Sequence, residues 1–209
     1  MNDRLIIIGA SGHGKVVADI AEKMGKYKQI ALLDDNGSIE TCNDFPVIGK
    51  SNDADKYLGD TDFFVAIGNA EIRRKLFDSL VEKGAKIPVL IHPDAVIGKN
   101  VSIDIGTVVM AGVVINSETE IGKGCIINTS ASVDHDCKIH DYVHVSVGAH
   151  IAGTVEIGDN TWLGIGSTVS NNVAIAKNSI IGAGAVVIKD IPENCVAVGA
   201  PAKPIKFKE

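Results

Sequence analysis

The fold of this chain is decided by residues 121–151, which read IGKGCIINTSASVDHDCKIHDYVHVSVGAHI. Within this stretch an Ile or Val recurs at every sixth position, from Ile121 to Ile151. The same spacing continues in both directions, so that Ile, Val or Leu occupies positions 91, 97, 103, 109, 115, 121, 127, 133, 139, 145, 151, 157, 163, 169, 175, 181 and 187. Neither an α-helix nor an ordinary strand has a period of six, whereas the stacked strands of a parallel β-helix do.

A second column of side chains lies four residues after each of these anchor positions. Its members are small or β-branched: Ala95, Val101, Thr107, Val113, Thr119, Cys125, Ala131, Cys137, Val143, Ala149, Val155, Thr161, Ser167, Val173, Ser179 and Ala185. Two inward columns of this kind would bury one continuous aliphatic core along the coils. We therefore expect Cys125 and Cys137 to be packed inside as unreactive thiols.

The pattern resembles the hexapeptide-repeat acyltransferases over the whole second half of the chain, including the closing segment VGAPAKPIK at residues 198–206. In that family three hexads form one triangular coil, and the helix is left-handed. The resemblance therefore implies a left-handed parallel β-helix, with between five and six coils between positions 91 and 187.

Composition and charge exclude several classes of protein. Aromatic residues make up 4% of the chain and hydrophobic residues 45%, so the core must be mostly aliphatic. The net charge is −6 without a cluster of Lys and Arg, which argues against a nucleic-acid-binding surface. No apolar run is long enough for membrane insertion or a signal peptide, and the four cysteines form no Cys-x-x-Cys pair. We therefore expect a cytoplasmic protein with reduced thiols.

The first part of the chain follows a different pattern, in which apolar runs alternate with helical periodicity. Three strands and two helices are predicted there, at residues 5–9, 30–35 and 63–68 and around residues 16–24 and 72–80, respectively. This alternation favours a small Rossmann-like α/β domain with a parallel sheet. The expected fold class is α/β plus all-β, with domains at residues 1–88 and 89–198 and a C-terminal extension at 199–209.

The turn GASGHG at residues 9–14 connects the first predicted strand and helix. Backbone N–H groups at a helix N-terminus bind phosphate, but the order G-x-x-G-x-G differs from the dinucleotide pattern G-x-G-x-x-G. Asp34 lies twenty residues after Gly14, at the end of the next strand, where an acid can hydrogen-bond a ribose or a base. The short domain favours a mononucleotide, and a purely structural turn remains the alternative.

Four of the six histidines fall within residues 135–150, and none is in an inward column. On one face of the coil, residues 18 apart stack, and no His or acid stacks on His135 or His144. Their neighbours in that register are Ser117, Gly153, Ile126 and Trp162. A metal site within one chain therefore lacks ligands, and a site shared between chains stays open.

The segment DHDC at residues 134–137 places His135 between two acids. A neighbouring carboxylate raises the basicity of a histidine and fixes its tautomer. Acyl transfer from a thioester to an amine needs such a base, because a protonated amine has no lone pair. From the residues alone, a catalytic base and a solvated His–Asp surface pair are equally good interpretations.

A narrower resemblance is carried by NTSASVDHDC and HVSVGAHIAG in the second half, and by GASGHG, LDD and AIGN in the first. Together they look like the bacterial UDP-4-amino-sugar N-acetyltransferases of the bacillosamine pathway, which are related to the sialic acid O-acetyltransferases. The resemblance implies acetyl-CoA as co-substrate, a UDP-amino-sugar substrate, no metal, and direct transfer without an acyl-enzyme. It also implies a homotrimer with active sites between subunits.

The same resemblance implies roles for individual residues. His135 matches the general base, and Asp136 matches the acid, usually Glu, that raises its basicity. Acetyl-CoA would be bound by His144 at the acetyl group, by the N–H of Gly153 near the thioester, and along the pantetheine by Ile165 and Ala183. The UDP moiety would be bound by Ser11, Gly12, His13, Asp34, Asp35 and Gly68. His140 and His150 would be surface residues without a chemical role.

Three other interpretations remain open. The nearest is an O-acetyltransferase acting on sialic acid or another surface sugar. A non-catalytic β-helix would show a regular ladder of Thr or Ser along one exposed face, and the sequence has none. A metal-dependent hydrolase on a β-helix would contain zinc and would lose activity with a chelator.

Overall fold

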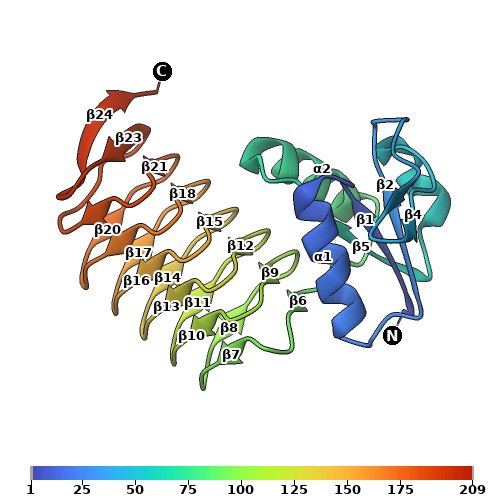
Figure 1. The fold of residues 1–209 in the computed structure, drawn as a ribbon, viewed down its shortest axis with the longest axis horizontal. Coiled ribbons are helices and arrows are strands. Elements are labelled where there is room, and N and C mark those ends of the chain that lie inside the picture. Colours follow the sequence, from blue (N-terminus) through green and yellow to red (C-terminus); the bar gives the residue numbers. More distant parts are fainter. Residues whose placement is uncertain (1, 209) are drawn as a thin grey trace. The chain divides into compact units, whose positions relative to one another are not determined.

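The computed structural model describes residues 2–208, and two compact units divide the chain after Pro93. The first unit is a parallel sheet with helices, and the second is a parallel β-helix, as Figure 1 shows. The fold class expected from the sequence is therefore confirmed. Within residues 2–208, neither α-helix is long and apolar enough to cross a membrane.

The first unit is built on a three-stranded parallel sheet of order β2-β1-β5. Its elements are β1 (Arg4–Ile8), α1 (Gly12–Lys23), β2 (Gln29–Leu33), the hairpin β3 (Thr41–Cys42) and β4 (Phe45–Pro46), a 3-10 helix (Ser51–Tyr57), β5 (Thr61–Val65), α2 (Ala70–Glu82) and β6 (Leu90–Ile91). The apolar residues of β1 and β5 are almost fully buried, because a parallel sheet is covered on both faces.

The glycine turn brings α1 very close to the end of β1. A Cβ atom on Gly14 would collide with the carbonyl oxygen of Gly9. Gly9 itself has φ +107°, a conformation that L side chains rarely adopt. Both glycines are therefore required by the strand-to-helix packing, whatever the turn binds.

The second unit consists of two-residue strands that stack into three parallel sheets. The strands are β7 (Val96–Ile97), β8 (Ser102–Ile103), β9 (Val108–Val109), β10 (Val114–Ile115), β11 (Glu120–Ile121), β12 (Ile126–Ile127), β13 (Ser132–Val133), β14 (Lys138–Ile139), β15 (His144–Val145), β16 (His150–Ile151), β17 (Glu156–Ile157), β18 (Trp162–Leu163), β19 (Thr168–Val169), β20 (Ala174–Ile175), β21 (Ile180–Ile181) and β22 (Val186–Val187). Every anchor from Ile97 to Val187 is the last residue of its strand, so the period of six is confirmed.

The three sheets take every third strand. One has the order β7-β10-β13-β16-β19-β22, the second β8-β11-β14-β17-β20, and the third contains β9-β12-β15-β18-β21. Each strand from β7 to β19 pairs in parallel with the strand 18 residues later, as Val96 does with Val114. Both predicted columns point inward and are buried from Thr107 onward. The anchors Ile97 and Ile103 are only half-buried, because in this unit the first coil has a neighbouring coil on one side only.

Sharp corners separate the strands of one coil. From Asn100 to Gly184, the third residue after each anchor has a positive φ between 56° and 71°. Gly, Asn and Asp tolerate this left-handed conformation best, and they fill most of these corners. Asp136 occupies one of them with φ 58°.

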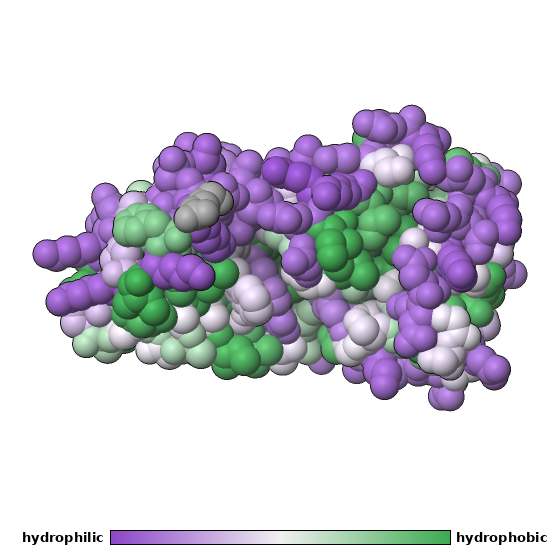
Figure 2. Space-filling view, turned by 90° about the horizontal axis from the view of Figure 1, so that it is seen from above, coloured by the Kyte–Doolittle hydropathy of each residue, from purple (hydrophilic) through white to green (hydrophobic). Residues whose placement is uncertain are grey.

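The chain ends in a short extension beyond the last coil. Strand β23 (Cys195–Val198) pairs in parallel with β21, and β24 (Lys203–Phe207) pairs antiparallel with β23. Large apolar side chains are exposed at several places on the second unit, including Val96, Trp162, Ile165, Ile188 and Phe207. On the face drawn in Figure 2, apolar side chains form separate groups between hydrophilic ones.

Candidate active site

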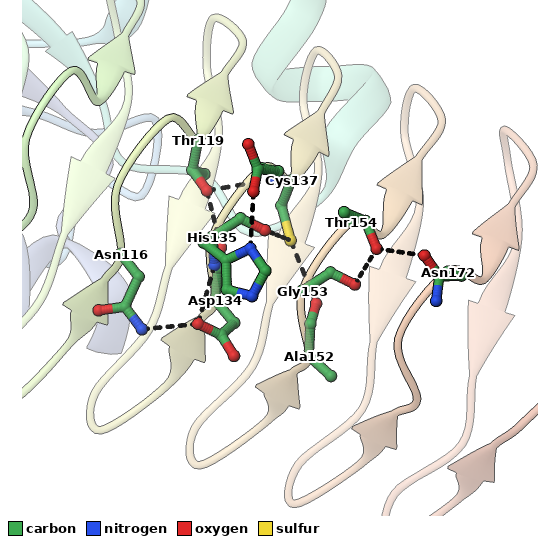
Figure 3. A network of polar contacts seen from close by, with 10 residues as sticks. Asn116, Thr119, Asp134, His135, Cys137, Ala152, Gly153, Thr154 and Asn172 are labelled. Atoms are coloured by element: carbon green, nitrogen blue, oxygen red, sulfur yellow. Dashed lines mark hydrogen bonds and ion pairs between the residues drawn. The ribbon is translucent and has the colours of Figure 1, made fainter.

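His135 lies at the corner between β13 and β14, with its side chain exposed and hydrogen-bonded to the next residue (Figure 3). Its Nδ1–H donates to Asp136 Oδ2 at 2.7 Å. The backbone N–H of His135 donates to Asp134 Oδ1 at 2.9 Å, and Asn116 Nδ2 donates to the same oxygen at 2.7 Å. The imidazole of His135 is thus hydrogen-bonded to Asp136, and the backbone N–H of His135 is hydrogen-bonded to Asp134.

These acids change the acid–base behaviour of the imidazole. The hydrogen bond to Asp136, followed by the charge of Asp134, raises the pKa of His135 above its ordinary value. The hydrogen bond from Asn116 and the N–H of His135 lower the pKa of Asp134, which keeps that carboxyl ionised. Because Nδ1 carries the hydrogen-bonded proton, the neutral ring has its lone pair on Nε2.

Gly153 forms the surface beneath the imidazole, one coil further along the chain. A Cβ atom at this position would lie 2.7 Å from His135 Cε1 and Nε2. The backbone ladder fixes this register, because the N–H of Thr154 donates to the carbonyl oxygen of His135 at 2.9 Å. The absence of a side chain at Gly153 therefore lets Nε2 lie directly over the backbone of the next coil.

Cys137 is adjacent to this site in the sequence but points into the interior. Its thiol is fully buried and lies 3.2 Å from the carbonyl oxygen of Ala152. Burial raises the pKa of the Cys137 thiol, which disfavours the reactive thiolate. Cys125 is buried in the same column, so both cysteines are packed inside, as predicted.

His144 lies on a different sheet, in β15. Its ring stacks on Trp162 of β18, and its Nε2 accepts a hydrogen bond from Asn128 Nδ2 at 3.2 Å. Ile165 and Ala183 are corner residues that follow β18 and β21 in the same sheet. Ile165 and Ala183 occupy the same place in adjacent coils. This register is fixed by the N–H of Gly184, the residue after Ala183, which donates to the carbonyl oxygen of Ile165 at 2.8 Å.

Two of the predicted acetyl-CoA residues, Ile165 and Ala183, lie at a different corner of the coil from the predicted base. His135 and Gly153 follow β13 and β16, at the corner that leads into the sheet of β14 and β17. Ile165 and Ala183 instead lead out of the sheet of β15, at the corner before β19 and β22. One chain therefore brings His135 and Gly153 together, and it places Ile165 and Ala183 at another edge.

The predicted nucleotide residues of the first unit gather at one edge of its sheet. Ser11, Gly12 and His13 open α1 after β1, Asp34 and Asp35 follow β2, and Gly68 follows β5. The carboxyl ends of parallel strands share one edge, where ligands of open α/β sheets bind. A Cβ atom on Gly12 or Gly68 would meet no atom within 4 Å in residues 2–208, so the backbone is approachable at both positions.

Asp34 and Asp35, the two acids of this group, both accept hydrogen bonds from nearby residues of the first unit. Asp34 Oδ2 accepts a hydrogen bond from Ala10 N at 2.6 Å, and its Oδ1 accepts one from Asn36 N at 2.8 Å. Asp35 accepts hydrogen bonds from the hydroxyl and the N–H of Ser51, which lower its pKa. The carboxylate of Asp34, at the end of β2, is thus hydrogen-bonded to the backbone of the glycine turn.

His13 is uncharged at neutral pH. Burial and the charge of Arg73 lower the pKa of His13 to about 4. Its Nε2 atom is buried and makes no hydrogen bond within residues 2–208. Arg73 is itself buried and donates from its guanidinium to the carbonyl oxygens of Ile67 and Gly68, both at 2.8 Å.

The sequence named Asp134 and Trp162 as neighbours of His135 and His144, but sequence reasoning missed Asn116, Asn128 and Arg73. Asn116 hydrogen-bonds Asp134, Asn128 hydrogen-bonds His144, and Arg73 lies near His13. Asn116 could have been found, because it stands 18 residues before Asp134. Arg73 gave no signal, because its approach to the glycine turn depends on how α2 packs.

The remaining surface histidines have partners outside these groups. His140 Nε2–H donates to Glu156 Oε1 at 2.9 Å, and His150 Nδ1 lies 2.8 Å from Ser132 Oγ. In the part of the chain that the structure describes, no three His, Cys, Asp or Glu residues are grouped as metal ligands would be.

Comparisons with known protein families match both units. Residues 4–80 match the PglD N-terminal domain family, and residues 154–189 match the bacterial transferase hexapeptide family (six repeats). UDP-N-acetylbacillosamine N-acetyltransferase from Bacillus subtilis is 36% identical over 110 residues. That alignment spans 50% of this chain and 50% of the relative.

Solved structures match over nearly the whole chain. The acetyltransferase domain of PglB from Neisseria gonorrhoeae, also solved with acetyl coenzyme A, is 41% identical with a TM-score of 0.95. The match covers 98% of this chain and 100% of that one. A variant of perosamine N-acetyltransferase from Caulobacter crescentus, in complex with CoA and GDP-perosamine, is 35% identical with a TM-score of 0.93, and 97% of each chain is covered. The chain therefore belongs to the hexapeptide-repeat sugar N-acetyltransferases, enzymes that use acetyl-CoA.

Proposed function

We propose that this protein transfers the acetyl group of acetyl-CoA to the 4-amino group of a UDP-4-amino-4,6-dideoxy sugar. The observation that carries this proposal is the His135 imidazole, bound through Nδ1–H to Asp136 with Nε2 over Gly153. In this arrangement Nε2 is the atom that accepts a proton, and the backbone of the next coil lies beside it. The β-helix would bind acetyl-CoA, and the first unit would bind the nucleotide.

In the proposed reaction the acetyl group passes directly to the sugar, without a covalent enzyme intermediate. His135 Nε2 removes a proton from the neutral 4-amino group of the sugar as the nitrogen attacks, so that the nitrogen lone pair bonds to the thioester carbonyl carbon. The carbonyl π electrons move to oxygen, where the N–H of Gly153 and the ring of His144 stabilise the oxyanion. Collapse of this intermediate breaks the C–S bond, and the CoA thiolate takes up the proton that His135 holds.

Nucleotide binding by the first unit is supported by its three strand ends and by the N-terminus of α1. A twelve-residue helix presents unpaired backbone N–H groups at its start, and these attract phosphate oxygens. The relative from Bacillus subtilis is named for a UDP sugar, whereas the Caulobacter crescentus relative was solved with GDP-perosamine. A GDP-4-amino sugar is therefore the alternative substrate.

The separation of His135 from Ile165 and Ala183 supports a homotrimer with active sites between subunits. If all three residues serve one site, a second chain must supply one set, because one chain holds them at different corners. Exposed apolar side chains on the β-helix, including Ile165 at 62% and Ile188 at 52% exposure, support contact with another copy.

Replacing Gly153 with Ala should lower kcat by about 10²-fold, because the added methyl group displaces the His135 ring from its position. Steady-state rates of CoA release would measure the effect. Gly37→Ala is the matched control, because a Cβ atom there meets nothing within 4 Å in residues 2–208. Equal rates for Gly153→Ala and Gly37→Ala would show that the ring does not need this surface.

The pH dependence of kcat/KM should reflect the acids beside His135. A general base is active when deprotonated, so the rate should fall as the pH falls through the pKa of His135, which lies above 6.5. Asp136→Asn removes the largest cause of the raised pKa and should move this fall to lower pH. Profiles of both proteins would measure the shift, and superimposable profiles would contradict the role of Asp136.

The proposed function is tested by measuring CoA release with a thiol reagent. Acetyl-CoA would be offered with a UDP-4-amino-4,6-dideoxy sugar, with GDP-perosamine or with free sialic acid. We expect fast release with the UDP sugar alone. Release with GDP-perosamine alone would show that the substrate is a GDP sugar and not a UDP sugar. Release with sialic acid alone would overturn both N-acetylation and the binding of a nucleotide by the first unit.

A further inference from the structure

Trp162, the only tryptophan of the chain, lies beside His144 and has no part in the mechanism above. It is the register partner of His144 in the neighbouring strand. The two rings are parallel within 1°, and their centroids are 5.6 Å apart. Aromatic rings attract each other in offset stacks at about 4.5–7 Å. Trp162, which is not part of the proposed site, is therefore packed on His144, the residue that would contact the acetyl group.

Both rings of this stack are held by hydrogen bonds at their edges. Trp162 Nε1–H donates to the buried Ser146 Oγ at 2.6 Å, which fixes the indole. Asn128 Nδ2 donates to His144 Nε2, and Asn128 Oδ1 accepts from Thr129 N at 2.8 Å, so the orientation of the amide is defined. Since Nε2 accepts a hydrogen bond, a neutral His144 carries its proton on Nδ1.

The torsion between Cβ and the imidazole ring is broad in histidine, so the plane of the His144 ring can tilt unless a neighbour packs against its face. A flat indole against the face of the ring removes that tilt. The plane of His144, and with it the direction of its N–H, depends on Trp162.

We propose that Trp162 is a positioning residue for acetyl transfer, which holds the imidazole of His144 in the plane that directs its N–H at the thioester carbonyl. This proposal rests on the role proposed for His144 above. It adds that an aromatic ring is required at position 162. Trp162 is 50% exposed, so replacing it removes no core side chain, and the variants should fold.

The stack is tested first without any substrate. Trp162 is the only source of tryptophan fluorescence, so its emission reports its own surroundings. Loss of the imidazole in His144→Ala should shift this emission to longer wavelength and increase quenching by acrylamide, while His140→Ala should change neither. An emission spectrum and a quenching constant that His144→Ala leaves unchanged would overturn the stack in solution.

The functional part is tested by comparing two replacements of similar bulk. Trp162→Phe keeps a ring over His144 and should retain kcat within about threefold, whereas Trp162→Leu removes it and should lower kcat about tenfold, equivalent to about 1.4 kcal/mol. The KM for the sugar nucleotide should be the same in both. Equal kcat values for the Phe and Leu variants would overturn the positioning role.

These outcomes are distinct from failure of the proposed function. If the wild-type protein released no CoA with any amino-sugar nucleotide, the transfer reaction would be wrong. The fluorescence result would still stand, because it needs neither acetyl-CoA nor sugar. If wild-type turnover is fast and Trp162→Leu matches Trp162→Phe, only the role of Trp162 is wrong.

Discussion

His135→Asn should lower kcat by about 10²–10⁴-fold, the effect that removal of a general base produces. Asn has similar size and cannot accept the proton at pH 7. The hydrogen bond that His135 makes with Asp136 lies on the surface, so its loss should leave the β-helix intact. Turnover with acetyl-CoA and the best amino-sugar nucleotide would measure the loss, and thermal unfolding would check the fold.

The matched control for this experiment is His140→Asn. His140 is also an exposed histidine bound to an acid, with Nε2 2.9 Å from Glu156 Oε1, but it lies at the next corner of the coil, after β14. We expect His140→Asn to turn over at the wild-type rate. If His135→Asn did the same, the His135–Asp136 pair would be the solvated surface pair that the sequence also allows.

Mixed oligomers of two inactive variants should recover activity that neither variant has alone. His135→Asn lacks the base, and His144→Ala lacks a donor to the oxyanion, a loss of about 10²–10³-fold in kcat. If each site takes His135 from one subunit and His144 from the next, every mixed trimer contains one intact site. Random mixing at equal amounts should then restore about one quarter of the wild-type rate.

Co-expression with two different affinity tags would give these mixed oligomers, and CoA release would measure their activity. Mixing His135→Asn with His135→Ala is the control, because no arrangement of those chains contains the base, and no recovery is expected. If the first mixture also failed to recover, both histidines would serve from the same chain, and a site that takes them from two subunits would be wrong. A monomer in sedimentation would contradict the trimer directly.

The β-helix could be predicted from the sequence because its packing is local and repetitive. Each coil repeats the same contacts with the next, so a period of six in Ile, Val and Leu fixes strand, register and core together. The same register, in which residues 18 apart stack, places Gly153 against His135 and Trp162 against His144. The order of acids around His135 was equally visible, because Asp134 and Asp136 are its sequence neighbours.

Other features depended on contacts between elements that no sequence spacing records. The low pKa of His13 arises from burial and from Arg73, which reaches the glycine turn only because α2 follows β5 at the edge of the sheet. The carboxylate of Asp34, expected to face a nucleotide, hydrogen-bonds the turn through Ala10.

The sequence by itself thus determined the repeat, the inward columns and the acids beside His135, since each is set by residues at fixed separations. The tertiary structure alone decided that the His135 ring places Nε2 and Cε1 over Gly153, that Asn128 hydrogen-bonds His144 Nε2, and that the rings of His144 and Trp162 are parallel. The physical reason is that the plane and the tautomer of an imidazole ring are set by side-chain packing in three dimensions, which residue spacing does not encode.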